Sequence, residues 1–330
     1  DVDPRIMVRR DPGDTKGPFY HVAQEGIIQD YDGTGVRRGT WNVDFNRNWP
    51  TDWQPEHGQG GASDYPFSQP ETRAVGTFML EHPNVFAGAD FHCGSNAILR
   101  PPSGPDSEIN QDDLTQILEI GKIAEQITGF PLMTARQYSV SWRNPHVWRG
   151  SFRDFAYLQL GISQYAIELG NGFNCAGIRT RDYLDADDKT KERDCMRQVL
   201  AFHDQHNSQI FVPWKEFDHP QLGKVEIGGL MQGVAYYMYP PVLAEIVPKT
   251  TAFIKMHAQR RPQLTISRAE AQGIADGVYR VRAVVANIGG FSTCVMASGE
   301  SRPSNKPVRV RLTDLGETEV VSRGNVQEVA

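Results

Sequence analysis

The sequence predicts an α/β domain followed by a small all-β sandwich domain. Up to about residue 258, buried apolar strands alternate with amphipathic helices, which is typical of an α/β domain. After Arg260-Arg261-Pro262, short runs of alternating apolar and polar residues are separated by Gly, Ser, Pro and Asn, which is typical of a sandwich. We therefore place a boundary near residue 260 and expect domains at 1–258 and 262–330.

Apolar residues at helical spacing predict four helices in the first domain. These are expected at Glu71 to His82, Asp113 to Thr128, the segment after the charged stretch 179–194, and Val242 to Ala258. For the first helix we expect an inward face of Ala74, Val75, Phe78 and Met79, and for the third one of Cys195, Met196, Val199, Leu200 and Phe202.

Two apolar runs predict buried strands that end in a polar side chain. The run from Asn84 ends at His92, and the run from Ile162 to Leu169 contains Glu168 close to its end. In the second domain, alternation predicts short strands at 264–266, 279–285 and 308–312.

Composition narrows the function classes. The chain is 39% hydrophobic and 22% charged, with a formal net charge of −6, which is ordinary for a globular protein and argues against a nucleic-acid partner. No apolar run is long enough to span a membrane. The four cysteines form no Cys-x-x-Cys pair, so we do not expect a thiolate zinc site.

Three features carry candidate chemistry. Asn46-Arg47 can bind a carboxylate through amide and guanidinium donors, although a capped turn with a surface arginine explains the same pair. His92 at a strand end is either a metal ligand or a hydrogen-bonded core histidine. Glu168 in an apolar strand is either a general base with a shifted pKa or part of a buried ion pair.

Taken in order, these motifs resemble those of the M14 (carboxypeptidase A-like) zinc carboxypeptidases. The resemblance rests on Asp44 to Trp49, Pro70-Glu71-Thr72-Arg73-Ala74, the strand ending at His92, Gly150 to Tyr157, and Glu168-Leu169. His219 to Gly229 is similar to a segment of some bacterial members. The resemblance covers roughly residues 1–258 and implies a mixed-sheet domain.

The resemblance implies a Zn²⁺ cofactor and hydrolysis of the C-terminal peptide bond of a peptide or cell-wall peptide. His92 would bind zinc, and Glu168 would be the general base. Asn46 and Arg47 would hold the substrate carboxylate. Arg9, with Arg10 as the alternative, would stabilise the oxyanion.

The same resemblance places Arg153 at the floor of the pocket for the terminal side chain. An arginine there favours an acidic terminal residue, and a structural salt bridge is the alternative. His146 falls near the position of the family's mobile tyrosine and is a candidate substrate contact, with Tyr138 as another.

One family motif is missing. No His-x-x-Glu occurs in the sequence, and His21 and Glu25 are one residue too far apart. We therefore expect a domain incomplete at its N-terminus, which alone binds zinc poorly and hydrolyses little. The alternatives are an inactive peptide-binding protein of the same fold, or a scaffold or adhesion protein that acts through the sandwich.

Overall fold

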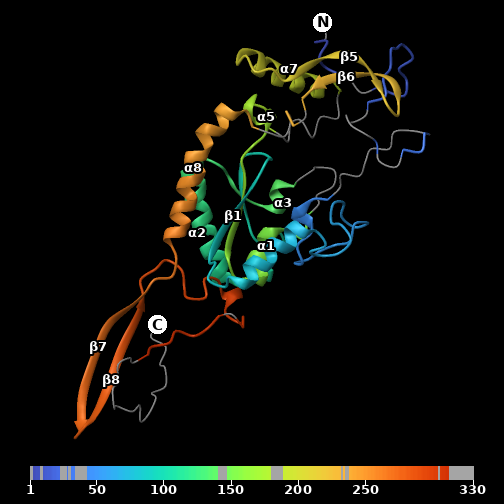
Figure 1. Cartoon of the computed structure of the whole chain (residues 1–330). Helices are drawn as coiled ribbons and strands as arrows, with labels where there is room; N and C mark the ends of the chain where they lie inside the picture. The colour runs from blue at the N-terminus through green and yellow to red at the C-terminus, as the bar shows by residue number, and fades with distance from the viewer. Residues whose placement is uncertain are drawn as a thin grey trace.

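The core of the protein is a mixed four-stranded sheet flanked by helices (Figure 1). The computed structural model describes residues 3–7, 10–22, 28, 31–33, 43–139, 147–179, 189–231, 233–234, 238–303 and 305–311. The sheet has the strand order β1-β4-β2-β3. Its strands are β1 (Ala87–His92), β2 (Ala97–Arg100), β3 (Leu132–Thr134) and β4 (Ser163–Glu168). This architecture confirms the expected mixed α/β fold.

The sheet mixes parallel and antiparallel pairs. β1 runs parallel to β4, β2 runs antiparallel to β4, and β3 runs parallel to β2. Because β1 and β4 are parallel neighbours, their C-terminal ends lie at the same edge of the sheet. The two strands that end in His92 and Glu168 were both predicted from the sequence.

Two long helices cover one face of this sheet. α2 (Gln111–Thr128) and α8 (Pro240–Gln259) pack against each other and bury Ile117, Ile120, Ile246 and Phe253 against Tyr165 and Ile167 of β4. Since side chains alternate along a strand, Gln164, Ala166 and Glu168 lie on the opposite face. The α2–α8 layer therefore builds the core, and the other face of the sheet is left for the site.

The helix α1 (Pro70–Glu81) forms where it was predicted, but of its predicted inward face only Met79 is buried. Val75 and Phe78 are 46% and 52% exposed, and Ala74 is exposed as well. The buried residues are Thr72, Gly76 and Met79. Gly76 lies under the Phe67 ring, where a Cβ atom would approach ring carbons to 2.6 Å. The close packing of Gly76 against Phe67 therefore places inward a different face of α1 from the one that its apolar residues predicted.

The segment after 188 forms α7 (Lys189–Gln205), as expected, with Cys195, Val199 and Leu200 buried. A hairpin follows, made of β5 (Phe211–His219) and β6 (Gly223–Leu230). The shorter elements of the chain are η1 (Phe45–Arg47), η2 (Asp106–Glu108), α3 (Ala135–Tyr138), α4 (Phe152–Asp154), η3 (Phe155–Gln159), α5 (Gly172–Cys175) and η4 (Ala297–Gly299).

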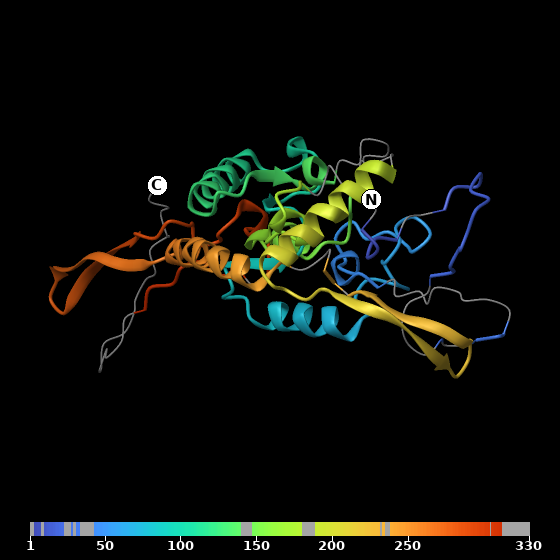
Figure 2. The same ribbon diagram turned by 90° about the horizontal axis from the view of Figure 1, so that it is seen from above.

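The C-terminal part contains the hairpin of β7 (Leu264–Ala275) and β8 (Val278–Asn287), which projects away from the sheet (Figures 1 and 2). Within the described residues this part forms a two-stranded sheet, so the predicted sandwich is not seen there. Residues 308–311 lie outside helix and strand. The division into domains 1–258 and 262–330 stays a prediction.

The segment after β8 returns to the sheet domain. Phe291 and Met296 are buried in the same cluster as α2 and α8. Asp113, near the start of α2, accepts hydrogen bonds from the Tyr157 hydroxyl at 3.0 Å and from the Ala297 and Ser298 backbone amides at 2.7 and 3.3 Å. One carboxylate thus joins three distant segments. No helix in the described part of the chain is long and apolar enough to cross a membrane.

Candidate active site

The site lies at the edge where β1 and β4 end. His92 and Glu168 are register partners on these parallel strands, and Asp90 pairs with Ala166 one step earlier. Register partners in a sheet share a face, so Asp90, His92 and Glu168 all lie on the face opposite α2 and α8. The two candidate residues at the ends of predicted strands are therefore neighbours.

The carboxylate of Glu168 is buried, with 8% of the residue exposed. Burial raises its pKa, and the nearby Asp90 charge raises it too. His92, Arg153 and Tyr138 oppose this rise. A carboxylate whose pKa is raised takes up a proton more readily than an exposed one, which suits a general base.

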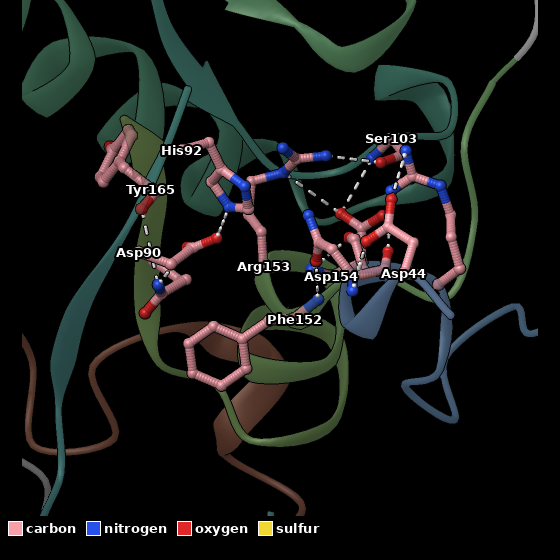
Figure 3. Close-up of polar contacts among 12 residues, drawn as sticks. Asp44, Asp90, His92, Ser103, Phe152, Arg153, Asp154 and Tyr165 are labelled. Atoms are coloured by element: carbon pink, nitrogen blue, oxygen red, sulfur yellow. Dashed lines mark hydrogen bonds and ion pairs between the residues drawn. The ribbon is translucent and has the colours of Figure 1, made fainter. Parts of the chain in front are cut away.

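A chain of hydrogen bonds holds His92. Its Nε2 lies 2.5 Å from Asp90 Oδ2, and Gln164 Nε2 donates to Asp90 Oδ1 at 2.8 Å. Figure 3 shows the contact between His92 and Asp90. Burial would lower the pKa of His92, but the hydrogen bond and charge of Asp90, together with Glu168, outweigh it and raise this pKa. With Nε2 held by a carboxylate, Nδ1 is the nitrogen left for a ligand.

Tyr138 reaches the site from α3. Its hydroxyl accepts a hydrogen bond from the Ser95 backbone amide at 2.8 Å and lies close to the Glu168 carboxylate, since a Cβ atom built on Gly94 would meet both groups. From the sequence, Tyr138 is a second candidate for substrate contact. The structure places its hydroxyl beside Glu168.

The Asn46-Arg47 pair lies in η1, which begins after the N-cap Asp44. Asn46 Oδ1 accepts from the Phe152 backbone amide at 2.8 Å, which fixes the amide group. Arg47 forms an ion pair with Asp44 at 3.3 Å and lies over the Trp148 ring at 4.3 Å. Burial lowers the pKa of Arg47, and the charges of Asp44 and Glu168 oppose this.

Arg153 is buried, with 3% of the residue exposed. It donates to Ser103 Oγ at 2.6 Å, and its Nε lies 3.6 Å from Asp154 Oδ1 (Figure 3). Its charge acts on His92, Glu168 and Arg47. The ion pair predicted as the alternative for Arg153 is thus present, although it is long, and the arginine still acts on Glu168 through its charge.

Two predicted site residues, Arg9 and His146, lie outside the described residues. The alternative Arg10 is exposed and points elsewhere, because it lies over the Phe19 ring at 4.2 Å and donates to the Asp14 carbonyl. Asp90 and Gln164 were missed by the sequence analysis. Asp90 precedes His92 by two residues on a strand, a spacing that puts both side chains on one face and could have indicated the pair.

The described residues do not by themselves fit a catalytic zinc. Such a site normally has three protein ligands and an open position. Among the residues that the structure describes, no group of three or more His, Cys, Asp or Glu side chains could hold a metal ion. His92 Nδ1 is a suitable donor for one metal bond, but the described residues do not complete a group of three ligands around it.

Comparison with known proteins gave two family matches. The model described as zinc carboxypeptidase, peptidase M14, matches residues 21–185. A model described as a domain of unknown function, DUF8731, matches residues 263–330. No curated protein matches the chain.

Among solved structures, similar chains include thrombin-activatable fibrinolysis inhibitor. One crystal structure of this protein has 17% identity and a TM-score of 0.30, with 48% of this chain and 41% of that chain covered. The bovine protein in complex with tick carboxypeptidase inhibitor has 19% identity and a TM-score of 0.32, with 50% and 56% covered. The chain thus spans about half the length of these structures.

Proposed function

The chain belongs to the M14 zinc carboxypeptidase family, and on that premise we propose that it is a metallocarboxypeptidase that removes the C-terminal residue of a peptide. The observation that carries the proposal is the grouping around Glu168. This buried carboxylate has a raised pKa, lies beside His92, and is within electrostatic range of Arg47 and Arg153.

In this proposal Glu168 accepts a proton from the attacking water and passes it to the leaving amine. Arg47 holds the terminal carboxylate of the substrate, and Asn46 adds an amide donor. The stacking of Arg47 on Trp148 and its ion pair with Asp44 fix the guanidinium before the substrate binds. Such fixation lowers the entropy cost of holding the substrate in a reactive position.

Zinc in such an enzyme polarises the scissile carbonyl and acidifies water. Among the described residues, His92 is the one candidate ligand for such a zinc ion. Asp90 orients the His92 ring, which is the usual task of a carboxylate beside a metal-binding histidine.

We assign to Arg153 a preference for a terminal Glu or Asp. Two observations support this: Arg153 is buried beside the base, and its guanidinium bonds to the neutral Ser103 hydroxyl. The ion pair with Asp154 is long, at 3.6 Å, so it leaves positive charge for an acidic substrate side chain.

A second candidate is a protein of this family that binds peptide C-termini without cleaving them. The observation that favours it is that the described residues hold no three-ligand metal group. Both candidates require the Arg47 carboxylate site, and they differ in whether Glu168 works as a base.

The test uses the whole chain with Zn²⁺ and a fluorescent peptide that ends in Glu, in free-acid and amidated forms. Fluorescence anisotropy measures binding, and mass spectrometry measures release of the terminal residue. We expect tighter binding of the free acid and, because this chain alone is expected to bind zinc poorly, only slow release of Glu from it. Binding of the acid without release would assign the peptide-binding function, and equal binding of both forms would overturn both candidates.

A further inference from the structure

Tyr138 is placed by a short, well-capped helix. At the start of α3, Thr134 Oγ1 accepts from the Gln137 amide at 3.1 Å, and Gln137 Oε1 accepts from the Thr134 amide at 2.8 Å. The Tyr138 ring packs against a buried cluster of Ala97, Leu99 and Ala166 on the site face of the sheet. The ring is therefore fixed by packing, and only its hydroxyl end reaches the site.

The Tyr138 hydroxyl has a defined hydrogen-bonding direction. It accepts from the Ser95 backbone amide at 2.8 Å, so its own proton is available to donate. Burial raises the pKa of Tyr138 above its usual range, so the hydroxyl keeps that proton. The Glu168 carboxylate lies close to the hydroxyl, and its negative charge raises the pKa of Tyr138 further.

Gly94 makes room for this contact. A Cβ atom built on Gly94 would overlap the Tyr138 hydroxyl and would lie 2.6 Å from Glu168 Oε2. Any other residue at this position would push the hydroxyl and the carboxylate away. Three chain segments, the loop after β1, α3 and the end of β4, thus meet at one hydroxyl group.

We propose that Tyr138 is a positioning residue that holds the carboxylate of Glu168 through its hydroxyl, with Gly94 providing the space and the Ser95 amide setting the direction. The role of this contact in catalysis rests on the proposed function, in which Glu168 is the base. The contact itself does not rest on it.

The contact is tested by NMR with tyrosine labelled at Cζ, the carbon that carries the hydroxyl. Tyr138→Phe identifies the Tyr138 signal by its disappearance. We expect Glu168→Gln and Gly94→Ala each to shift that signal and to leave the Tyr157 signal in place. Tyr157 is a matched control, since its buried hydroxyl donates to Asp113 at 3.0 Å, away from the site. A Tyr138 signal unmoved by Glu168→Gln would overturn the proposal.

The catalytic role is tested on the zinc-supplemented chain with the free-acid peptide. Loss of a hydrogen bond to a charged group should lower kcat of Tyr138→Phe on the order of tenfold, with KM unchanged. Tyr157→Phe should leave both unchanged apart from any loss of stability. Equal kcat in Tyr138→Phe and the unmodified chain would overturn the positioning role. If the unmodified chain binds but does not cleave, the proposed hydrolysis fails while the NMR result still decides the contact.

Discussion

The Arg47 guanidinium lies over the Trp148 indole, with Cζ 4.3 Å from the ring centroid, while its Nη2 lies 3.3 Å from Asp44 Oδ2. Stacking on an aromatic face and pairing with a carboxylate use different parts of the planar group. This combination leaves the guanidinium few orientations. In the proposed function, the site for the substrate carboxylate is thus formed before any substrate binds.

Replacing Arg47 by Lys should weaken binding of the free-acid peptide about tenfold, because lysine keeps the charge but loses the planar fork and the stack. Anisotropy titration measures the effect, and the amidated peptide should show no further loss. Arg149→Lys is the control, since Arg149 is partly exposed and pairs with Asp52 at 3.2 Å on the surface. An equal loss in both variants would contradict the assignment.

Glu168→Gln should lower the rate of terminal-residue release by about 100-fold or more, because it removes the proton acceptor. Peptide binding should stay within about twofold, since an amide has the size of the carboxylate and the Arg47 site is untouched. Mass spectrometry and anisotropy on the same preparation separate the two effects. Retained hydrolysis would remove Glu168 from the role of base.

Arg153→Met should reduce the preference for a terminal Glu over a terminal Leu about tenfold, because the buried positive charge is lost. Both peptides are compared on one variant, so a general loss of stability cancels from the ratio. Arg100→Met is the matched control, being another buried arginine, paired with Asp106 at 2.7 Å outside the site. A ratio changed equally by both variants would disprove the specificity role.

His257 should make stability fall in acid. Burial, followed by the Arg260 charge, lowers its pKa to about 4. In the unfolded chain this histidine takes up a proton near pH 6.5. The stability that comes from keeping His257 neutral is therefore fully present above pH 6.5 and is lost as the pH falls towards 4. The decline amounts to roughly 3 kcal/mol over this range.

His257→Gln should therefore flatten the loss of unfolding free energy between pH 7 and 4.5, measured by urea denaturation. Glutamine can keep a hydrogen bond to Ser163 Oγ, which lies 2.9 Å from the histidine Nε2, without titrating. His206→Gln, at an exposed position on the turn after α7, should leave the pH dependence as it was. Identical slopes in all three proteins would rule out the assignment.

Asp113→Ala should destabilise the protein by roughly 3 kcal/mol, because the buried Tyr157 hydroxyl and two backbone amides lose their acceptor. Thermal or urea unfolding measures the change. Asp112→Ala, one residue earlier in the same first turn of α2 and exposed, is the control and should cost less than about 1 kcal/mol.

The sequence was sufficient for features that short segments determine. His92 and Glu168 lie at or near the ends of apolar runs, so the strands that carry them could be predicted, whereas the parallel pairing of these strands came from the structure. The inward face of α1 could not be predicted, because it depends on the Phe67 ring above Gly76, a contact that hydrophobic periodicity does not encode. The hydrogen bond to the Tyr138 hydroxyl could not be predicted either, because its donor, the Ser95 amide, lies 43 residues earlier in the sequence.

The carboxylate of Asp113 has a consequence for how the protein is made. Its partners at Ala297 and Ser298 follow it by 184 and 185 residues. During translation the chain emerges from the ribosome N-terminus first. The two hydrogen bonds that Asp113 accepts from these amides therefore cannot form until most of the polypeptide has been synthesised. Closing so long a loop is slow, which predicts that nascent chains stopped before Phe291 bind chaperones and are degraded by proteases.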